Sequence, residues 1–108
     1  YPAEVEAALI AHPDVMSCAV VGLPHPDLGS SIHAVLQLRD GANAEAVVGG
    51  MPSFLADILS RPKHPESYEV ANEPVRDDAG KVRRTMLRDE RVRWLQEGRE
   101  FRAMAARV

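Results

Sequence analysis

Apolar residues at a spacing of about four open the chain. Val5 and Leu9 predict a helix over about residues 2–11, which ends where a proline follows. The run 16–21, rich in small and β-branched residues, predicts a strand. Residues 23–30, with two prolines, an aspartate and a glycine, predict a loop.

Strict alternation of apolar and other residues follows from 32 to 38 and predicts a second, half-buried strand. A helical region is expected to reach about residue 60 in two pieces, because Gly49-Gly50 and Pro52 interrupt it. The second piece is expected to face the core with Phe54, Leu55, Ile58 and Leu59. Residues 68–71 predict a short third strand.

The last third of the chain predicts a loop over 77–81 and then one long helix over 82–108, which Gly98 weakens midway. Its apolar seam is expected to comprise Leu87, Val92, Leu95, Phe101 and Met104. The element order is helix, strand, strand, helix, strand, helix. This order predicts a single α+β domain: a small three-stranded sheet flanked by helices, with an extended C-terminal helix.

The charge of the chain changes sign at Lys81. Residues 1–80 carry 12 acidic and 4 basic side chains, whereas residues 81–108 carry 4 and 9. Gly80 permits a positive φ, and the two aspartates before it favour a turn, so Lys81 is expected at a loop tip. A lysine there is a mobile point charge that suits a phosphate or a carboxylate as charge moves between them.

Composition excludes several classes of function. The 108 residues are enough for one domain, and a net charge of −3 argues against a general nucleic-acid binder. No apolar run reaches the roughly 18–20 residues of a membrane span. The single cysteine, Cys18, has no disulfide partner in the chain and is expected in the core, and no signal peptide is visible, so we expect a cytoplasmic setting. Because the first residue is Tyr1, we expect the chain to begin inside a longer polypeptide.

The histidines do not predict a metal site. None of the four has a cysteine or histidine partner at metal-ligand spacing; they are His12, His25, His33 and His64. Trp94 is expected to pack within the molecule.

Four ordered groups of residues resemble one known family. They are Tyr1-Pro2-Ala3-Glu4-Val5-Glu6; Val20-Val21-Gly22 with Pro24, Pro26-Asp27 and Gly29; Lys63 with Pro65; and Gly80-Lys81 with Arg84. Together they resemble the small C-terminal domain of acyl-CoA synthetases, in the adenylate-forming superfamily. The resemblance covers about residues 1–88, and residues 89–108 are expected as a helical extension beyond the family core.

The resemblance implies a function for the whole of residues 1–108 as a lid domain. In the family, a large N-terminal domain, absent here, binds ATP, Mg²⁺ and a carboxylic acid such as a fatty acid. The lid supplies a lysine to the adenylation half-reaction and then rotates for thioester formation with CoA. Lys81 matches that catalytic lysine, and Gly80, Lys81 and Arg84 match the segment that meets substrate and nucleotide. The isolated domain is expected to be inactive.

One departure and one alternative accompany this interpretation. The family often has a proline four residues before the Gly-Lys pair, where this chain has Val75, so the shape of the loop is open. The arginines of the basic segment are expected to form mostly a solvated helix face paired with Asp89, Glu90 and Glu97; they are Arg83, Arg84, Arg88, Arg91 and Arg93. The alternative is a freestanding interaction module whose basic C-terminal helix binds an acidic partner or RNA.

Overall fold

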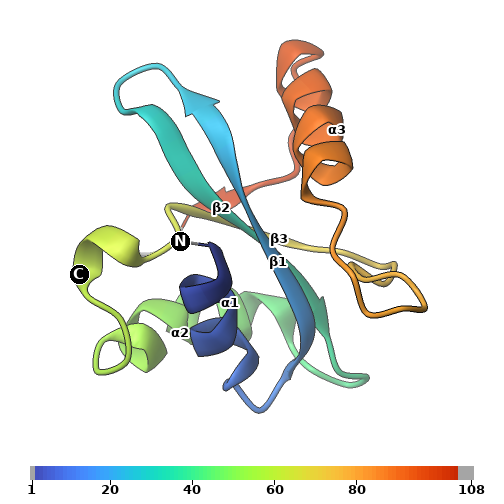
Figure 1. The fold of residues 1–108 in the computed structure, drawn as a ribbon. Helices are drawn as coiled ribbons and strands as arrows, with labels where there is room; N and C mark the ends of the chain where they lie inside the picture. The colour runs from blue at the N-terminus through green and yellow to red at the C-terminus, as the bar shows by residue number, and fades with distance from the viewer. Residues whose placement is uncertain (1, 105–108) are drawn as a thin grey trace.

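The structure, a computed structural model, describes residues 2–104 (Figure 1). Its elements in chain order are α1 (Pro2–Ile10), β1 (Val15–His25), β2 (Gly29–Leu38), α2 (Ala44–Leu55), the 3₁₀ turn η1 (Arg61–Lys63), β3 (Ser67–Val70), α3 (Arg84–Gln96) and β4 (Ala103–Met104). The predicted α+β class is confirmed. The sheet has four strands instead of the three expected, because the short β4 joins it.

The strand order in the sheet is β1-β2-β3-β4. β1 and β2 form an antiparallel hairpin, and β3 pairs with β2 in parallel after the chain has passed through α2. β4 pairs with β3 in the antiparallel sense. β2 and β3 are therefore the inner strands, and the long β1 is one edge of the sheet.

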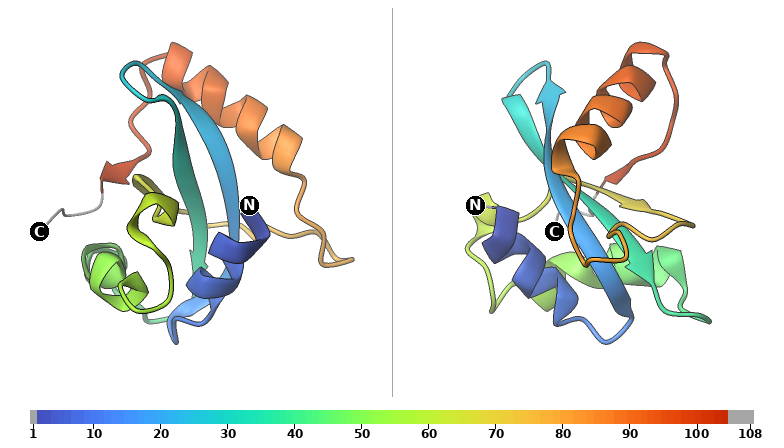
Figure 2. Two further views of the ribbon diagram at one scale, coloured as in Figure 1. Left: turned by 60° about the vertical axis from the view of Figure 1, so that its left-hand side comes forward. Right: turned by 45° about the vertical axis from the view of Figure 1, so that its right-hand side comes forward.

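Helices cover both faces of the sheet. α1 and α2 lie on one face and α3 lies on the other (Figure 2). Leu9, Leu36 and Met51 are fully buried in the first layer. In the second layer Val35 packs in a small cluster with which Leu87 of α3 makes contact. β2 is thus buried on both faces, so the expectation of a half-buried strand was wrong.

The first hairpin is longer than the sequence predicts. β1 continues through Pro24 to His25, and Pro24 pairs opposite Ser30, so most of the expected loop over 23–30 is strand. An edge strand tolerates proline, because the missing N–H is needed only on the side that faces a partner strand. The turn itself comprises only residues 26–28.

α2 is one continuous helix over Ala44–Leu55, with Pro52 inside it, and not two pieces. Its glycines are on exposed positions, while Met51 and Leu55 are fully buried against the sheet. Burying such side chains contributes about 1.5–3 kcal/mol each, which offsets much of the cost of the two glycines, about 1 kcal/mol each, and of the proline, about 3 kcal/mol. Leu59 is buried as expected, but Ile58 is exposed, so its predicted core position was wrong.

The prediction of one long C-terminal helix over 82–108 is also wrong. α3 ends at Gln96, and Gly98 follows with φ 74°, a left-handed conformation that ends helices. The chain then turns back, and Phe101 packs edge-on against Trp94 with ring centroids 5.2 Å apart. Residues 97–104 are therefore loop and strand, and residues 105–108 of the predicted helix lie outside the described residues.

Candidate functional site

Asp77 builds the loop that carries Lys81. The Asp77 carboxylate accepts hydrogen bonds from the N–H groups of Ala79 (3.0 Å) and Lys81 (2.9 Å), and its own N–H donates to the Lys81 carbonyl (3.0 Å). Gly80 has φ 78°, which closes the turn. Residues 77–81 are called the Lys81 loop below. The prediction of a turn over these residues is confirmed.

The side chain of Lys81 is exposed and has no hydrogen-bond or ion-pair partner within residues 2–104. The chain contains two lysines, and the other, Lys63, contacts both carboxylate oxygens of Glu4 at 3.0 and 3.1 Å. The ammonium group of Lys81 is therefore available for an anion from outside the described residues.

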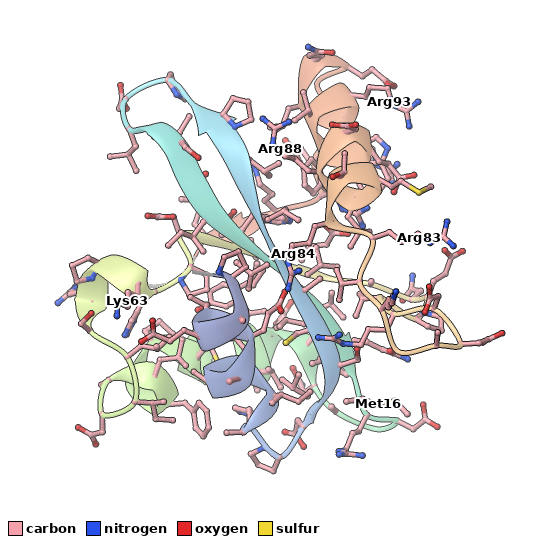
Figure 3. The ribbon with its side chains drawn as sticks, viewed as in Figure 1. Met16, Lys63, Arg83, Arg84, Arg88 and Arg93 are labelled. Atoms are coloured by element: carbon pink, nitrogen blue, oxygen red, sulfur yellow. The ribbon has the colours of Figure 1, made fainter. Side chains whose placement is uncertain are left out.

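Lys81 borders a groove of about 600 Å³ between residues 74–83 and α3. Its apolar wall includes Val75 and Met86, and Arg93 of α3 lines it from the helix side. Figure 3 shows Arg83 and Arg93 on the side of the molecule away from α1. Asp77, Asp89 and Glu90 also line the groove, but each already has a cationic partner. The side chain of Arg93, like that of Lys81, has no acidic or hydrogen-bonding partner among the described residues.

Arg84, the third candidate site residue, is directed towards α1 and not towards the groove. Its Nη2 donates to Oε1 of Glu6, a buried residue of α1. Figure 3 shows Arg84 between α1 and α3. Gly80 and Lys81 therefore lie together in the loop, while Arg84 contacts the protein itself at the start of α3. Val75 is buried and packs with Ala19 and Val35, so at the position where the family often has a proline this chain has a core residue.

A buried polar cluster that the sequence did not predict lies beneath α3. Arg91 and Glu69 form a salt bridge there, and Nε2 of His33 is 3.0 Å from Oε1 of Glu69. The sequence did carry a signal, because Leu87, Arg91 and Leu95 are spaced four apart on one face of α3. The expectation of a mostly solvated helix face was wrong for Arg91, which is buried, although Arg91 also pairs with Glu90, and Arg88 with Asp89, as expected.

Burial lowers the pKa of His33, and the nearby charges of Arg91 and Arg102 act in the same direction, although Glu69 opposes them. Burial alone would raise the pKa of Glu69, but the hydrogen bonds from His33 and Arg91 and the positive charge of Arg91 hold it below its ordinary value. The cluster therefore contains a charged Glu69–Arg91 pair and a neutral imidazole at pH 7.

Ser67 gives this cluster the outline of a catalytic triad, since its Oγ is 2.7 Å from Nδ1 of His33. The serine is 1% exposed and the histidine is fully buried, so no substrate reaches the hydroxyl. The arrangement is a structural hydrogen-bond chain across β2 and β3.

Two further features concern possible metal and membrane functions. Among residues 2–104, no group of three or more His, Cys, Asp or Glu side chains is placed to hold a metal ion. In the same part of the chain, every helix is too short or too polar to cross a bilayer.

Comparison with known proteins identifies the family. The model of the family "AMP-binding enzyme C-terminal domain" matches residues 4–81, so the match ends at Lys81. A "Medium/long-chain-fatty-acid--CoA/3-oxocholest-4-en-26-oate--CoA ligase" of Mycobacterium tuberculosis is 37% identical over 102 residues, which are 94% of this chain and 17% of the relative. This chain thus spans about a sixth of that relative's length.

Solved structures share the fold. An acyl-CoA synthetase of Brucella canis superposes with a TM-score of 0.79 and 29% identity, over 88% of this chain and 18% of that one. ATP-bound MatB of Rhodopseudomonas palustris gives a TM-score of 0.71 at 30% identity, over 85% of this chain and 18% of that one. In fold and in sequence, this chain belongs to the family of AMP-binding enzyme C-terminal domains found in acyl-CoA synthetases.

Proposed function

We propose that this chain is the lid of an ATP-dependent acyl-CoA synthetase and that Lys81 serves the adenylation half-reaction. A carboxylate oxygen of the acid attacks the α-phosphorus of ATP, the bond to the bridging oxygen breaks, and pyrophosphate leaves. The thiol of CoA then attacks the carbonyl carbon of the acyl adenylate, and AMP leaves. The first step brings two anions together, so a cation at the reacting oxygens lowers a barrier that is largely electrostatic.

The free ammonium group of Lys81 is the observation that carries this proposal. The hydrogen bonds of Asp77 hold the lysine's backbone, while its side chain has no partner among the described residues. A fixed attachment with a mobile charge suits contact with phosphate and carboxylate oxygens in turn. The groove beside Lys81, with Arg93 on its far wall, offers further room and positive charge for the same anionic ligand.

The remaining parts of the reaction are assigned to a large N-terminal domain. We propose that this domain binds ATP, Mg²⁺ and the acid, and that this chain closes over it for adenylation and then rotates for thioester formation with CoA. The proposed acid is an aliphatic carboxylic acid such as a fatty acid, in line with the name of the mycobacterial relative. ATP as cosubstrate is supported by the similarity to ATP-bound MatB. On its own the domain is expected to be inactive.

The alternative, a basic helix that binds RNA or an acidic partner, loses support from the contacts of α3. Arg84 and Arg91 are held by Glu6 and Glu69, and Arg88 lies 3.6 Å from Asp89. Only a minority of the positive charges on the helix remains for a partner.

The test separates the two half-reactions in the full-length protein that contains this chain. Lys81→Ala should lower the rate of acid-dependent pyrophosphate release on the order of 10²- to 10³-fold, as loss of one preorganised donor does elsewhere. Thioester formation from a supplied acyl adenylate and CoA should change much less. Lys63→Ala is the matched control, because Lys63 is the other lysine of the chain and is already paired with Glu4. Equal losses in both half-reactions would contradict the assigned role.

A further inference from the structure

Two arginines on either side of the Lys81 loop converge on one carboxylate oxygen. Arg76 immediately precedes the loop, and Arg84 follows Lys81 by three residues. Nη2 of Arg84 donates a hydrogen bond to Oε1 of Glu6, and Nη2 of Arg76 lies 3.9 Å from the same oxygen. The two ends of the loop are therefore attracted to a single point on α1.

Glu6 is itself a fixed point. Its side chain is only 8% exposed, and its second oxygen, Oε2, accepts a hydrogen bond from the backbone N–H of Val20 at 2.8 Å. One oxygen thus contacts the edge strand β1, and the other contacts the arginines. Because both oxygens are engaged and the group is buried, rotation of the carboxylate would break a hydrogen bond on one side or the other.

A direct contact links this point to the lysine. Nη1 of Arg76 donates to the carbonyl oxygen of Gly80 at 3.0 Å. That carbonyl belongs to the peptide bond between Gly80 and Lys81, so Arg76 fixes the peptide plane from which the Lys81 side chain departs. The N–H of the same peptide bond donates to Asp77. Glu6 is therefore connected through Arg76 to the peptide bond before Lys81, and through Arg84 to the start of α3, three residues after Lys81.

We propose that Glu6 is a positioning residue for Lys81: it fixes both ends of the loop, so that the ammonium group reaches the reacting oxygens when the lid closes. This inference rests on the proposed function. Misplacement of a reacting group by about 1 Å can lower a rate on the order of 100-fold, so the adenylation rate should be sensitive to how firmly the loop is held. Glu6 touches neither substrate nor nucleotide in this scheme.

Glu6→Gln in the full-length enzyme is the first variant. Glutamine keeps an oxygen for the N–H of Val20 but removes the negative charge that holds Arg76 and Arg84. We expect acid-dependent pyrophosphate release to fall on the order of tenfold or more, with thioester formation from a supplied adenylate nearly unchanged. Glu4→Gln is the matched control, because Glu4 is on the same helix, is exposed and pairs with Lys63 instead.

The decisive comparison is a double-mutant cycle with Lys81→Ala. A residue that acts through Lys81 has nothing left to position once the ammonium group is removed, so Glu6→Gln should then cause little further loss. A residue needed only for folding would lower the rate by the same factor in both backgrounds. Arg84→Gln removes the partner of Glu6 and leaves Glu6 in place. It should also lower the adenylation rate only when Lys81 is present, so it provides a second test if Glu6→Gln fails to fold.

The outcomes are distinguishable. If Lys81→Ala alone leaves adenylation intact, the proposed function fails and this inference fails with it. If Lys81→Ala abolishes adenylation while Glu6→Gln and Arg84→Gln leave it unchanged, or lower both half-reactions equally, only the positioning role of Glu6 is overturned. The positioning role is supported if Glu6→Gln lowers adenylation but not thioester formation, and if it causes no further loss of adenylation in the Lys81→Ala background.

Discussion

Arg91 of α3 and Glu69 of β3 form a bidentate salt bridge in the interior, with Nε 2.9 Å from Oε1 and Nη2 2.5 Å from Oε2. Both side chains are less than 10% exposed. The pair joins the helix that follows the Lys81 loop to an inner strand of the sheet. It also explains how an arginine takes a place among the leucines of α3.

Removing one member of this pair should strongly destabilise the fold. Arg91→Ala leaves the Glu69 carboxylate buried beside His33 without its main cation, and we expect the free energy of unfolding to fall by about 3–5 kcal/mol. Urea unfolding of the 108-residue chain measures this. Arg88→Ala is the control on the same helix: its pair with Asp89 is exposed, so a change of about 1 kcal/mol or less is expected. Similar losses in the two variants would contradict a special role for the buried pair.

Stability should fall as the pH falls below about 6.5. The pKa of His33 is lowered from its ordinary value of 6.5, chiefly by burial, so the unfolded chain takes up a proton at this histidine before the folded chain does. Uptake by the unfolded state favours unfolding, and the loss grows as the pH falls towards the folded pKa. The pKa of Glu69 is lowered from 4.5, which adds a second loss below that pH.

Urea unfolding at pH 7.5, 6.5 and 5.5 tests the contribution of His33. The free energy of unfolding should decrease between pH 6.5 and 5.5 in the unmodified chain, and the decrease should be smaller in His33→Gln, which cannot titrate. The groups that face the imidazole, namely Glu69, Arg91 and Arg102, are unchanged in this comparison. Identical pH slopes in both chains would show that His33 does not control stability in this range.

Alanine should have opposite effects at two glycines. Gly80 has φ 78° in the Lys81 loop, so Gly80→Ala forces a left-handed conformation that costs about 1–2 kcal/mol, although no atom lies within 4 Å of the added Cβ. Gly49 is inside α2 with equally open surroundings, so Gly49→Ala should stabilise by about 0.5–1 kcal/mol. Thermal unfolding should show a lower melting temperature for Gly80→Ala and a higher one for Gly49→Ala. Equal shifts in melting temperature would contradict the assigned loop conformation.

Cys18 should be inert in the folded chain. Burial, with a smaller contribution from the charge of Glu6, raises the pKa of Cys18 to about 11, and the side chain is 1% exposed. Because the thiolate is the reactive form, labelling at pH 8 should be on the order of 100-fold slower in the folded chain than in urea. A chain with Cys18→Ala and Met16→Cys is the control, since Met16 is 54% exposed and a thiol there should react quickly.

The sequence predicted the features that depend on local pattern. The helix at Val5 and Leu9, the alternating strand and the turn before Lys81 follow from residue spacing and from the preferences of glycine and aspartate. It failed where distant contacts decide the outcome. The packing of Met51 keeps α2 continuous through Pro52, and Glu69 draws Arg91 into the interior.

The C-terminal segment also shows that contacts between distant residues cannot be predicted from local sequence pattern. The sequence predicts a weak point at Gly98 in a long helix, and in the structure α3 ends at Gln96, just before this glycine. The return of the chain to form β4 depends on contacts with β3 and on the packing of Phe101, which the spacing of residues along one helix does not encode. The sequence predicts Gly80 and Lys81 as candidate site residues from their local pattern, whereas the carboxylate proposed to hold their loop lies more than 70 positions away and has no local signal.

The salt bridge between Glu6 and Arg84 joins residues 78 positions apart. Such a contact forms only after most of the intervening chain is in place, because closing a long loop carries an entropy cost before the contact is gained. The Lys81 loop should therefore reach its final geometry late in folding. A fragment that begins after Glu6 would retain the lysine and the groove but lose the anchor of the loop. Domain boundaries for expression or for chimaeric enzymes should accordingly include α1.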